Sequence, residues 1–195
     1  MGKARLEAFS DGVIAIIITI MVLDLKIPSG ADMGAIGSLV PVFLNYVLSF
    51  VYVGIYWNNH HHLLHTVQRV SGGVLWANLH LLFWLSLFPF VTGWMGGNYT
   101  AAIPTAFYGV VLLMAALAYL VLERVIIANE GSNSLLARAV GGELKGRISV
   151  LLYALGIGVA FYSRVAAQLF YVTVALMWLV PDRRIERMVS DRPHR

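Results

Sequence analysis

Charged and hydroxyl side chains stand at the start of the first apolar segment of this chain. Arg5, Ser10 and Asp11 lie just before, or within the first turns of, an apolar run that continues to about residue 27. Ionisable groups at the edge of a hydrocarbon layer are costly and are rarely kept there without a functional reason. We therefore expect these side chains to have polar partners, because a buried charge without a partner is strongly destabilising.

Histidine is concentrated in a second polar stretch, which begins at Trp57 and contains His60, His61, His62 and His65. Histidines four residues apart, such as His61 and His65, share one face of a helix and could bind zinc. The chain has no cysteine and no H-E-x-x-H motif, so this ligand set is incomplete. A polar helix end at the membrane interface is the simpler interpretation of the same residues.

The composition indicates a polytopic membrane protein. Of 195 residues, 59% are hydrophobic and only 12% are charged, and the mean hydropathy is +0.76. Soluble domains are usually near half apolar and a quarter charged. The gaps between apolar runs are too short for an enzyme-sized domain, and no set of nucleophile, acid and base is present. The net charge is +4, and most lysines and arginines lie in those gaps and in the C-terminal tail, which indicates membrane topology and no nucleic-acid partner.

Six apolar runs predict an all-α protein with six transmembrane helices per subunit. Each is close to the ~20 residues that a helix needs to cross a bilayer, and together they form a single domain over residues 1–195. The last two runs are short and tightly joined, so they are either one helical hairpin or a single broken span. The expected spans are about 6–27, 39–64, 74–95, 104–128, 148–161 and 166–180.

The distribution of lysine and arginine predicts that the N- and C-termini are both cytoplasmic. If the N-terminus is inside, the segments on the outer side contain only Lys26 and Arg164. The inner segments carry all the other lysines and arginines, as the positive-inside rule requires. Five spans would place the termini on opposite sides and would break this pattern.

An apolar face runs along the first helix. At about 3.6 residues per turn, Ser10 and Asp11 point away from this face. In a single copy the face would lie against lipid, which is the ordinary interpretation. If several copies met around an axis, it would line a pore in which apolar rings gate ions by dewetting. The residues on this face are Gly12, Ile16, Thr19, Ile20, Leu23 and Ile27.

The motif R-x-x-x-F-S-D is matched in full by Arg5, Phe9, Ser10 and Asp11. It resembles the signature of the transmembrane protein 175 family of potassium channels, in particular its shorter bacterial members. The resemblance implies a multi-pass homotetramer in the plasma (inner) membrane of a bacterium. Its partners would be three further copies and the lipid bilayer. It also implies potassium as the permeant ion, with no cofactor and no metal site beyond permeating potassium.

The resemblance also assigns roles to residues of the first helix. The first helices would line the pore, and Ile16 would form its hydrophobic constriction. Thr19 would add a polar layer, and Ile20 and Leu23 would be adjoining apolar positions.

A hydrogen-bond network is implied around the motif. Trp57, His60 and His61 of the second span, with Asn78 and His80 of the third, would hold Ser10 and Asp11 in place. Arg5, Ser10 and Asp11 would then have a structural and gating role and would not coordinate ions. Which histidine faces the motif is left open. Imidazoles change charge between about pH 5 and 8, so these histidines could make gating pH-sensitive.

The chain has no T-V-G-Y-G sequence and no re-entrant loop, so a carbonyl cage cannot select the ion. Side chains of the first helix would have to do so, with potassium preferred over sodium but less strongly than in a carbonyl filter. Two other functions are compatible with the residues. One is a proton-coupled or other secondary carrier that uses Asp11 and the histidine cluster. The other is a non-transporting, metal-binding membrane protein.

Overall fold

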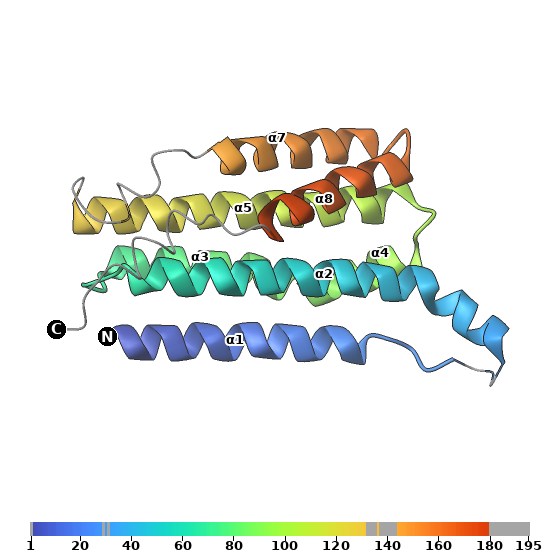
Figure 1. The fold of residues 1–195 in the computed structure, drawn as a ribbon, viewed down its shortest axis with the longest axis horizontal. Helices are drawn as coiled ribbons and strands as arrows, with labels where there is room; N and C mark the ends of the chain where they lie inside the picture. The colour runs from blue at the N-terminus through green and yellow to red at the C-terminus, as the bar shows by residue number, and fades with distance from the viewer. Residues whose placement is uncertain (1, 29, 31, 132–135, 137–143, 180–195) are drawn as a thin grey trace.

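The fold is an all-α bundle (Figure 1). The computed structural model describes residues 2–28, 30, 32–131, 136 and 144–179, and no strand occurs among them. Within these residues the helices are α1 (Lys3–Leu23), α2 (Met33–His65), α3 (Gly72–Ser86), α4 (Phe88–Gly97), α5 (Ala102–Glu130), α7 (Leu144–Val159) and α8 (Arg164–Leu179).

The number of membrane-crossing segments differs from the six expected. In the described part of the chain, four helical segments are long and apolar enough: Lys3–Leu23, Leu39–His65, Gly72–Gly97 and Ala102–Glu130. The helices α7 and α8 have 16 residues each. At about 1.5 Å per residue they are ~24 Å long, shorter than the ~30 Å hydrocarbon core. The prediction of six transmembrane helices is therefore wrong, because the described residues form four segments of this kind and the described parts of α7 and α8 are too short to span.

The C-terminal end of the last expected span, at residue 180, lies outside the described residues. The segment 181–195 also lies outside the described residues. It contains much of the basic charge from which the cytoplasmic position of the C-terminus is predicted.

The segment Gly72–Gly97 consists of two helices that meet at Leu87. Pro89 has no backbone N–H, and its ring would collide with the carbonyl of Leu85, so a continuous α-helix cannot pass through this point. The N–H of Leu87 instead bonds the carbonyl of Trp84, three residues back, at 3.3 Å. The break leaves α3 and α4 together long enough to cross the membrane once.

The start of α2 is set by a cap and altered by a proline. The Asp32 carboxylate accepts a hydrogen bond from the N–H of Ala35 at 2.8 Å, which satisfies a donor at the helix N-terminus. Pro41 lies inside the helix and removes one backbone hydrogen bond. Figure 1 shows the first turns of α2 bent away from the rest of the helix, as expected for an internal proline.

The helix α1 lies along one edge of the bundle and α7 along the opposite edge (Figure 1). One side of α1 packs against α2, α3 and α4, whereas α7 and α8 pack on each other and on α5. The pore-lining helix expected from the sequence is therefore a peripheral element of the single chain.

Two glycines allow α8 to pack closely on α5 and α7. Tyr171 of α8 is fully buried, and its ring lies directly over Gly109 of α5 and Gly156 of α7. The Tyr171 hydroxyl donates to the carbonyl of Thr105 at 3.2 Å. Any side chain at either glycine would occupy the space of this ring.

Replacing Gly156 with alanine is expected to destabilise the bundle by about 1–3 kcal/mol, the usual cost of overpacking. A Cβ at this position would lie 2.6 Å from Cε1 of Tyr171. Thermal unfolding in detergent, followed by circular dichroism, measures the loss. Gly158→Ala is the matched control in the same helix, because a Cβ there has no neighbour within 4 Å. Equal loss in both variants would contradict the close-packing explanation.

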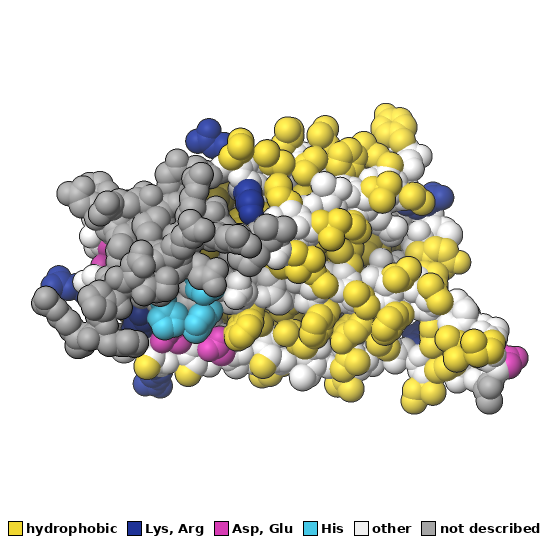
Figure 2. Space-filling view, viewed as in Figure 1, with side chains coloured by type: hydrophobic (Ala, Val, Ile, Leu, Met, Phe, Trp, Pro, Cys, Tyr) yellow, Lys and Arg dark blue, Asp and Glu magenta, His cyan; other side chains and the backbone are white. Residues whose placement is uncertain are grey.

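Outside the grey area of Figure 2, most of the coloured side chains on this face are apolar, and charged and histidine side chains lie mainly toward its ends. Histidines lie beside acidic side chains at the end where α1 begins and α2 finishes. This distribution suits an apolar belt in the membrane with polar groups near its interfaces.

Candidate functional site

The helix α1 has one buried face and one exposed face. The buried face consists of Leu6, Ser10, Ile14, Ile17 and Met21, which pack into the bundle. All the residues predicted on the apolar face are exposed in the single chain; among them Ile16 is 58% exposed and Leu23 is 79% exposed. The other exposed members are Gly12, Thr19, Ile20 and Ile27.

A buried hydrogen-bond network joins the first three helices through Ser10 of α1, Asn78 of α3 and His60 of α2. The amide nitrogen of Asn78 donates to the Ser10 hydroxyl oxygen at 2.9 Å. The amide oxygen of Asn78 lies 2.7 Å from Nε2 of His60. Because an amide oxygen can only accept, His60 donates from Nε2. The Ser10 hydroxyl in turn donates to the Leu6 carbonyl at 2.9 Å.

This network fixes α1 against both neighbours at one level of the bundle. Ser10 and Asn78 are fully buried, and His60 is 1% exposed. Buried polar groups without partners cost about 1–3 kcal/mol each, so every member depends on the others. A rotation of α1 that moved Ser10 away would leave the Asn78 amide without its acceptor.

Asp11 and Trp57 form a second link between α1 and α2. The indole Nε1 of Trp57 donates to the Asp11 carboxylate at 3.0 Å, and both side chains are exposed. Arg5 and Phe9, the remaining motif residues, are exposed on α1. In the described part of the chain no hydrogen bond or ion pair involves the Arg5 guanidinium, although the sequence predicts a partner for it.

Among the described residues, neither His61 nor His80 forms a hydrogen bond with a residue of the motif. His80 is exposed on α3, where its Nε2 accepts a hydrogen bond from Trp84 of the same helix at 3.0 Å. The exposed ring of His61 lies beside Trp57 and His65, with ring centroids 6.3 Å and 4.4 Å away. Of the three candidate histidines, only His60 joins the network of Ser10, and it does so through Asn78.

The Thr19 hydroxyl uses its proton inside α1. It donates to the carbonyl of Ile16 at 2.9 Å, so the oxygen keeps its two lone pairs free to accept. An exposed oxygen of this kind can face a cation. Ile16 and Thr19 are thus linked one turn apart on the same face.

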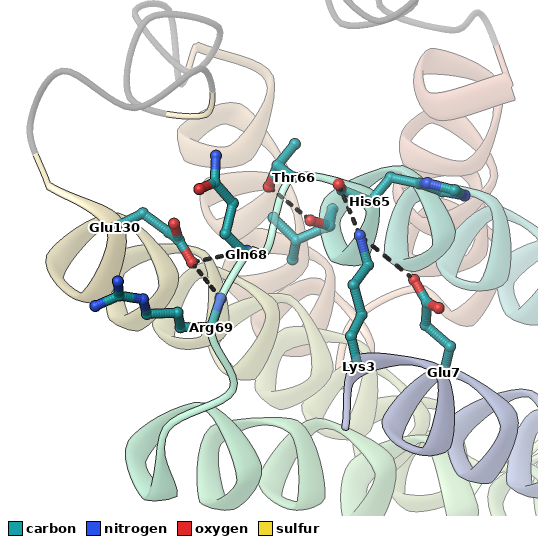
Figure 3. A network of polar contacts seen from close by, with 8 residues as sticks. Lys3, Glu7, His65, Thr66, Gln68, Arg69 and Glu130 are labelled. Carbon is teal, nitrogen blue, oxygen red and sulfur yellow. Dashed lines mark hydrogen bonds and ion pairs between the residues drawn. The ribbon is translucent and has the colours of Figure 1, made fainter. Parts of the chain in front are cut away.

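A polar latch that the sequence did not predict holds the beginning of α1 to the end of α2 (Figure 3). The ammonium group of Lys3 donates to the carbonyl of His65 at 2.9 Å and lies 3.9 Å from the Glu7 carboxylate. A cation at a helix C-terminus is favoured by the helix dipole. The i,i+4 spacing of Lys3 and Glu7 was a signal for the ion pair, but nothing in the sequence pointed to His65.

The loop between α2 and α3 is held by the end of α5 (Figure 3). The Glu130 carboxylate accepts from the backbone N–H groups of Gln68 and Arg69 at 2.8 and 3.0 Å. The amide of Asn129 donates to the Arg69 carbonyl at 2.8 Å. The polar ends of α1, α2 and α5 are therefore fixed on the same side of the bundle.

A second buried network lies deeper in the bundle and was also missed. Thr92 of α4 donates to the Ser49 hydroxyl of α2 at 2.6 Å, and Ser49 lies 2.9 Å from the hydroxyl of Tyr108 on α5. Isolated hydroxyl residues in apolar runs give no sign of their partners. No group of three or more histidine or acidic side chains that could hold a metal ion occurs among the described residues.

Long apolar helices with polar contacts buried between them define a multi-pass membrane protein. A family model described as "Endosomal/lysosomal potassium channel TMEM175" matches residues 5–89. A Chryseobacterium sp. (strain P1-3) protein named as a potassium channel is 55% identical over 98% of this chain and 100% of that protein. A Streptomyces collinus protein, also named as a potassium channel, is 35% identical over 60% of this chain and 61% of that protein.

A solved structure has the same fold. The crystal structure of a lysosomal potassium-selective channel TMEM175 homolog from Chamaesiphon minutus matches with a TM-score of 0.80 and 25% identity. The match covers 93% of this chain and 97% of that chain. This chain belongs to the TMEM175 family, which consists of ion channels and not of enzymes. It is a multi-pass bacterial membrane protein.

Proposed function

We propose that this chain is a potassium-permeable cation channel in which four copies surround a central pore lined by α1. The observation that carries the proposal is the exposed face of α1, whose residues include Ile16, Thr19 and Leu23. A peripheral helix with one face fixed and the other free can meet its copies around an axis. The similarity to proteins named as potassium channels supports the choice of ion.

Ile16 forms the gate in this proposal. Four isoleucine side chains at the same level would make an apolar neck that excludes water, and a dry neck stops ions. Ile20 and Leu23 would extend the apolar wall by one and two turns. The exposure of these residues in the single chain leaves them free to form such rings.

Thr19 is the proposed polar layer. Because its hydroxyl proton is bonded inside the helix, four threonine oxygens would face the pore as acceptors. Oxygen atoms can replace part of the water around a potassium ion. Such a single layer supports a preference for potassium over sodium that is weaker than that of a carbonyl filter.

The Ser10–Asn78–His60 network and the Asp11–Trp57 bond would set the tilt of α1, and the tilt sets the radius of the neck. In this proposal Ser10 and Asp11 bond α1 to the neighbouring helices and do not contact the ion. Arg5 and Phe9 complete the motif, and their exposed position leaves them available to a neighbouring copy.

Potassium flux into or out of liposomes tests the proposed function. Vesicles that contain the purified chain should release potassium down its gradient when a proton ionophore carries the compensating charge. Sodium gradients of the same size should give slower release. Empty vesicles and vesicles with an unrelated helical membrane protein are the controls. No flux above these controls in either gradient would contradict a channel.

The same vesicles distinguish a channel from a carrier. A channel gives flux that rises with the gradient and single-channel currents in planar bilayers. A proton-coupled carrier that uses Asp11 and the histidines would give saturable flux that stops without a proton gradient. Saturable, proton-dependent flux without unitary currents would overturn the channel proposal in favour of the carrier.

A further inference from the structure

Two imidazole rings lie together on the exposed side of α2, near its C-terminal end. His61 and His65 are one helical turn apart, and both side chains are exposed. Their ring centroids are 4.4 Å apart with an angle of 75° between the ring planes. This distance is shorter than those from the His61 ring to the rings of Trp57 and His62. Neither ring of the pair takes part in the Ser10–Asn78–His60 network.

The backbone of His65 forms the contact with α1, and its imidazole ring does not take part in that contact. Its carbonyl accepts the hydrogen bond from Lys3, while its imidazole is turned away from Lys3 in Figure 3. The contact that joins α1 to α2 therefore does not occupy the ring nitrogens. The ring can bind a ligand without breaking that contact.

Neutral imidazoles at i and i+4 can each direct a nitrogen lone pair toward one metal ion, with metal–nitrogen distances of about 2.0–2.1 Å for zinc. The observed spacing of the two rings needs only side-chain rotation to reach this arrangement. The Glu7 carboxylate lies near this end of α2, since it pairs with the same lysine that bonds the His65 carbonyl. The Lys3 ammonium offsets this carboxylate, so the site depends on the two imidazole nitrogens.

We propose that His61 and His65 form a two-ligand site for a transition-metal cation of the copper, nickel or zinc type. The described residues contain no group of three or more ligands, so water would complete the coordination. His62 is a poor third ligand, because it is only half-exposed and points to another side of the helix, with its ring centroid 5.7 Å from that of His61.

The chemistry of the site predicts its selectivity. Nitrogen ligands favour copper over nickel and zinc, and favour all three over manganese. Magnesium and calcium prefer oxygen ligands and should not compete. The site is independent of ion conduction, so the metal measurement and the flux measurement can fail separately.

Copper binding to the purified, tag-free chain in detergent tests the proposal. Titration calorimetry with Cu²⁺ should show saturable binding that excess calcium does not displace. Electron paramagnetic resonance of the bound copper should show coordination by two imidazole nitrogens. His61→Ala and His65→Ala should each weaken binding by about tenfold or more, which equals ~1.4 kcal/mol.

His62→Ala is the matched control, because it removes a neighbouring histidine of α2 and keeps both members of the pair. It should keep both the affinity and the two-nitrogen spectrum. Far-ultraviolet circular dichroism of each variant checks that the helices are intact. Copper binding that survives both His61→Ala and His65→Ala, or that is lost equally in His62→Ala, would overturn the proposal.

Discussion

Replacing Ile16 with asparagine is expected to raise potassium flux through the reconstituted protein by about tenfold or more. This corresponds to a barrier for ion passage that is lower by ~1.4 kcal/mol. A ring of amide groups holds water where a ring of isoleucines excludes it, so the neck would stay wet. Selectivity should fall at the same time, because ions could pass with more of their hydration shell. Liposome flux with potassium and sodium gradients measures both changes.

A cysteine variant provides the control for this result. The natural chain has no cysteine, so a positively charged thiol reagent can act only at an introduced residue. Flux through Ile16→Cys should fall when the reagent is added. Leu117→Cys is the matched control, because Leu117 is exposed on α5, away from α1. Equal sensitivity of both variants, or unchanged flux in Ile16→Asn, would contradict a gate at Ile16.

Replacing Asn78 with alanine is expected to lower the stability of the bundle by about 2–6 kcal/mol, because two buried groups lose their partner at about 1–3 kcal/mol each. The Nε2 proton of His60 would have no acceptor, and the Ser10 oxygen would have no donor. Unfolding in detergent, followed by heat or denaturant, measures the change. The flux should change as well, since α1 would lose its hydrogen bond to α3.

Asn59→Ala is the matched control for the network. The Asn59 amide donates to the carbonyl of Ile55 in its own helix at 2.9 Å, so its removal breaks no hydrogen bond between the described helices. A small effect in this variant and a large effect in Asn78→Ala would support the network. A double mutant of Asn78 and His60 should lose less than the sum of the two single changes, because the residues act together. Additive losses would contradict that coupling.

The helical periodicity of the sequence was enough to separate the two faces of α1. The helical repeat fixes the angle between the directions of the Ser10 and Ile16 side chains. This angle does not depend on tertiary contacts. The face predicted around Ile16 is exposed in the structure. Its role as a pore lining remains a proposal, because it needs further copies of the chain.

The number of spans could not be obtained from hydropathy alone. The last two apolar runs form α7 and α8, which are divided by a tight connection around residues 160–163 and have 16 described residues each. Hydropathy also did not show that Leu87 divides one span into α3 and α4. Both features depend on where backbone hydrogen bonding stops, and that is decided by local sterics such as the ring of Pro89.

The partners of the motif were only partly predictable. Three histidines were candidates for Ser10, and the choice of His60 depends on the rotation of α2 relative to α1, which packing of the whole bundle determines. Lys3 and His65 meet through a backbone carbonyl, and a backbone group leaves no trace in the sequence. A prediction from residue types therefore found the kind of network but could not choose its members.

A pore lined by α1 requires four copies of this chain around one axis. Native mass spectrometry of the protein released from detergent micelles counts the chains without any assumption about conduction. We expect a dominant species with the mass of four chains. A protein that is monomeric or dimeric at all concentrations would leave Ile16 facing lipid and would rule out the proposed pore.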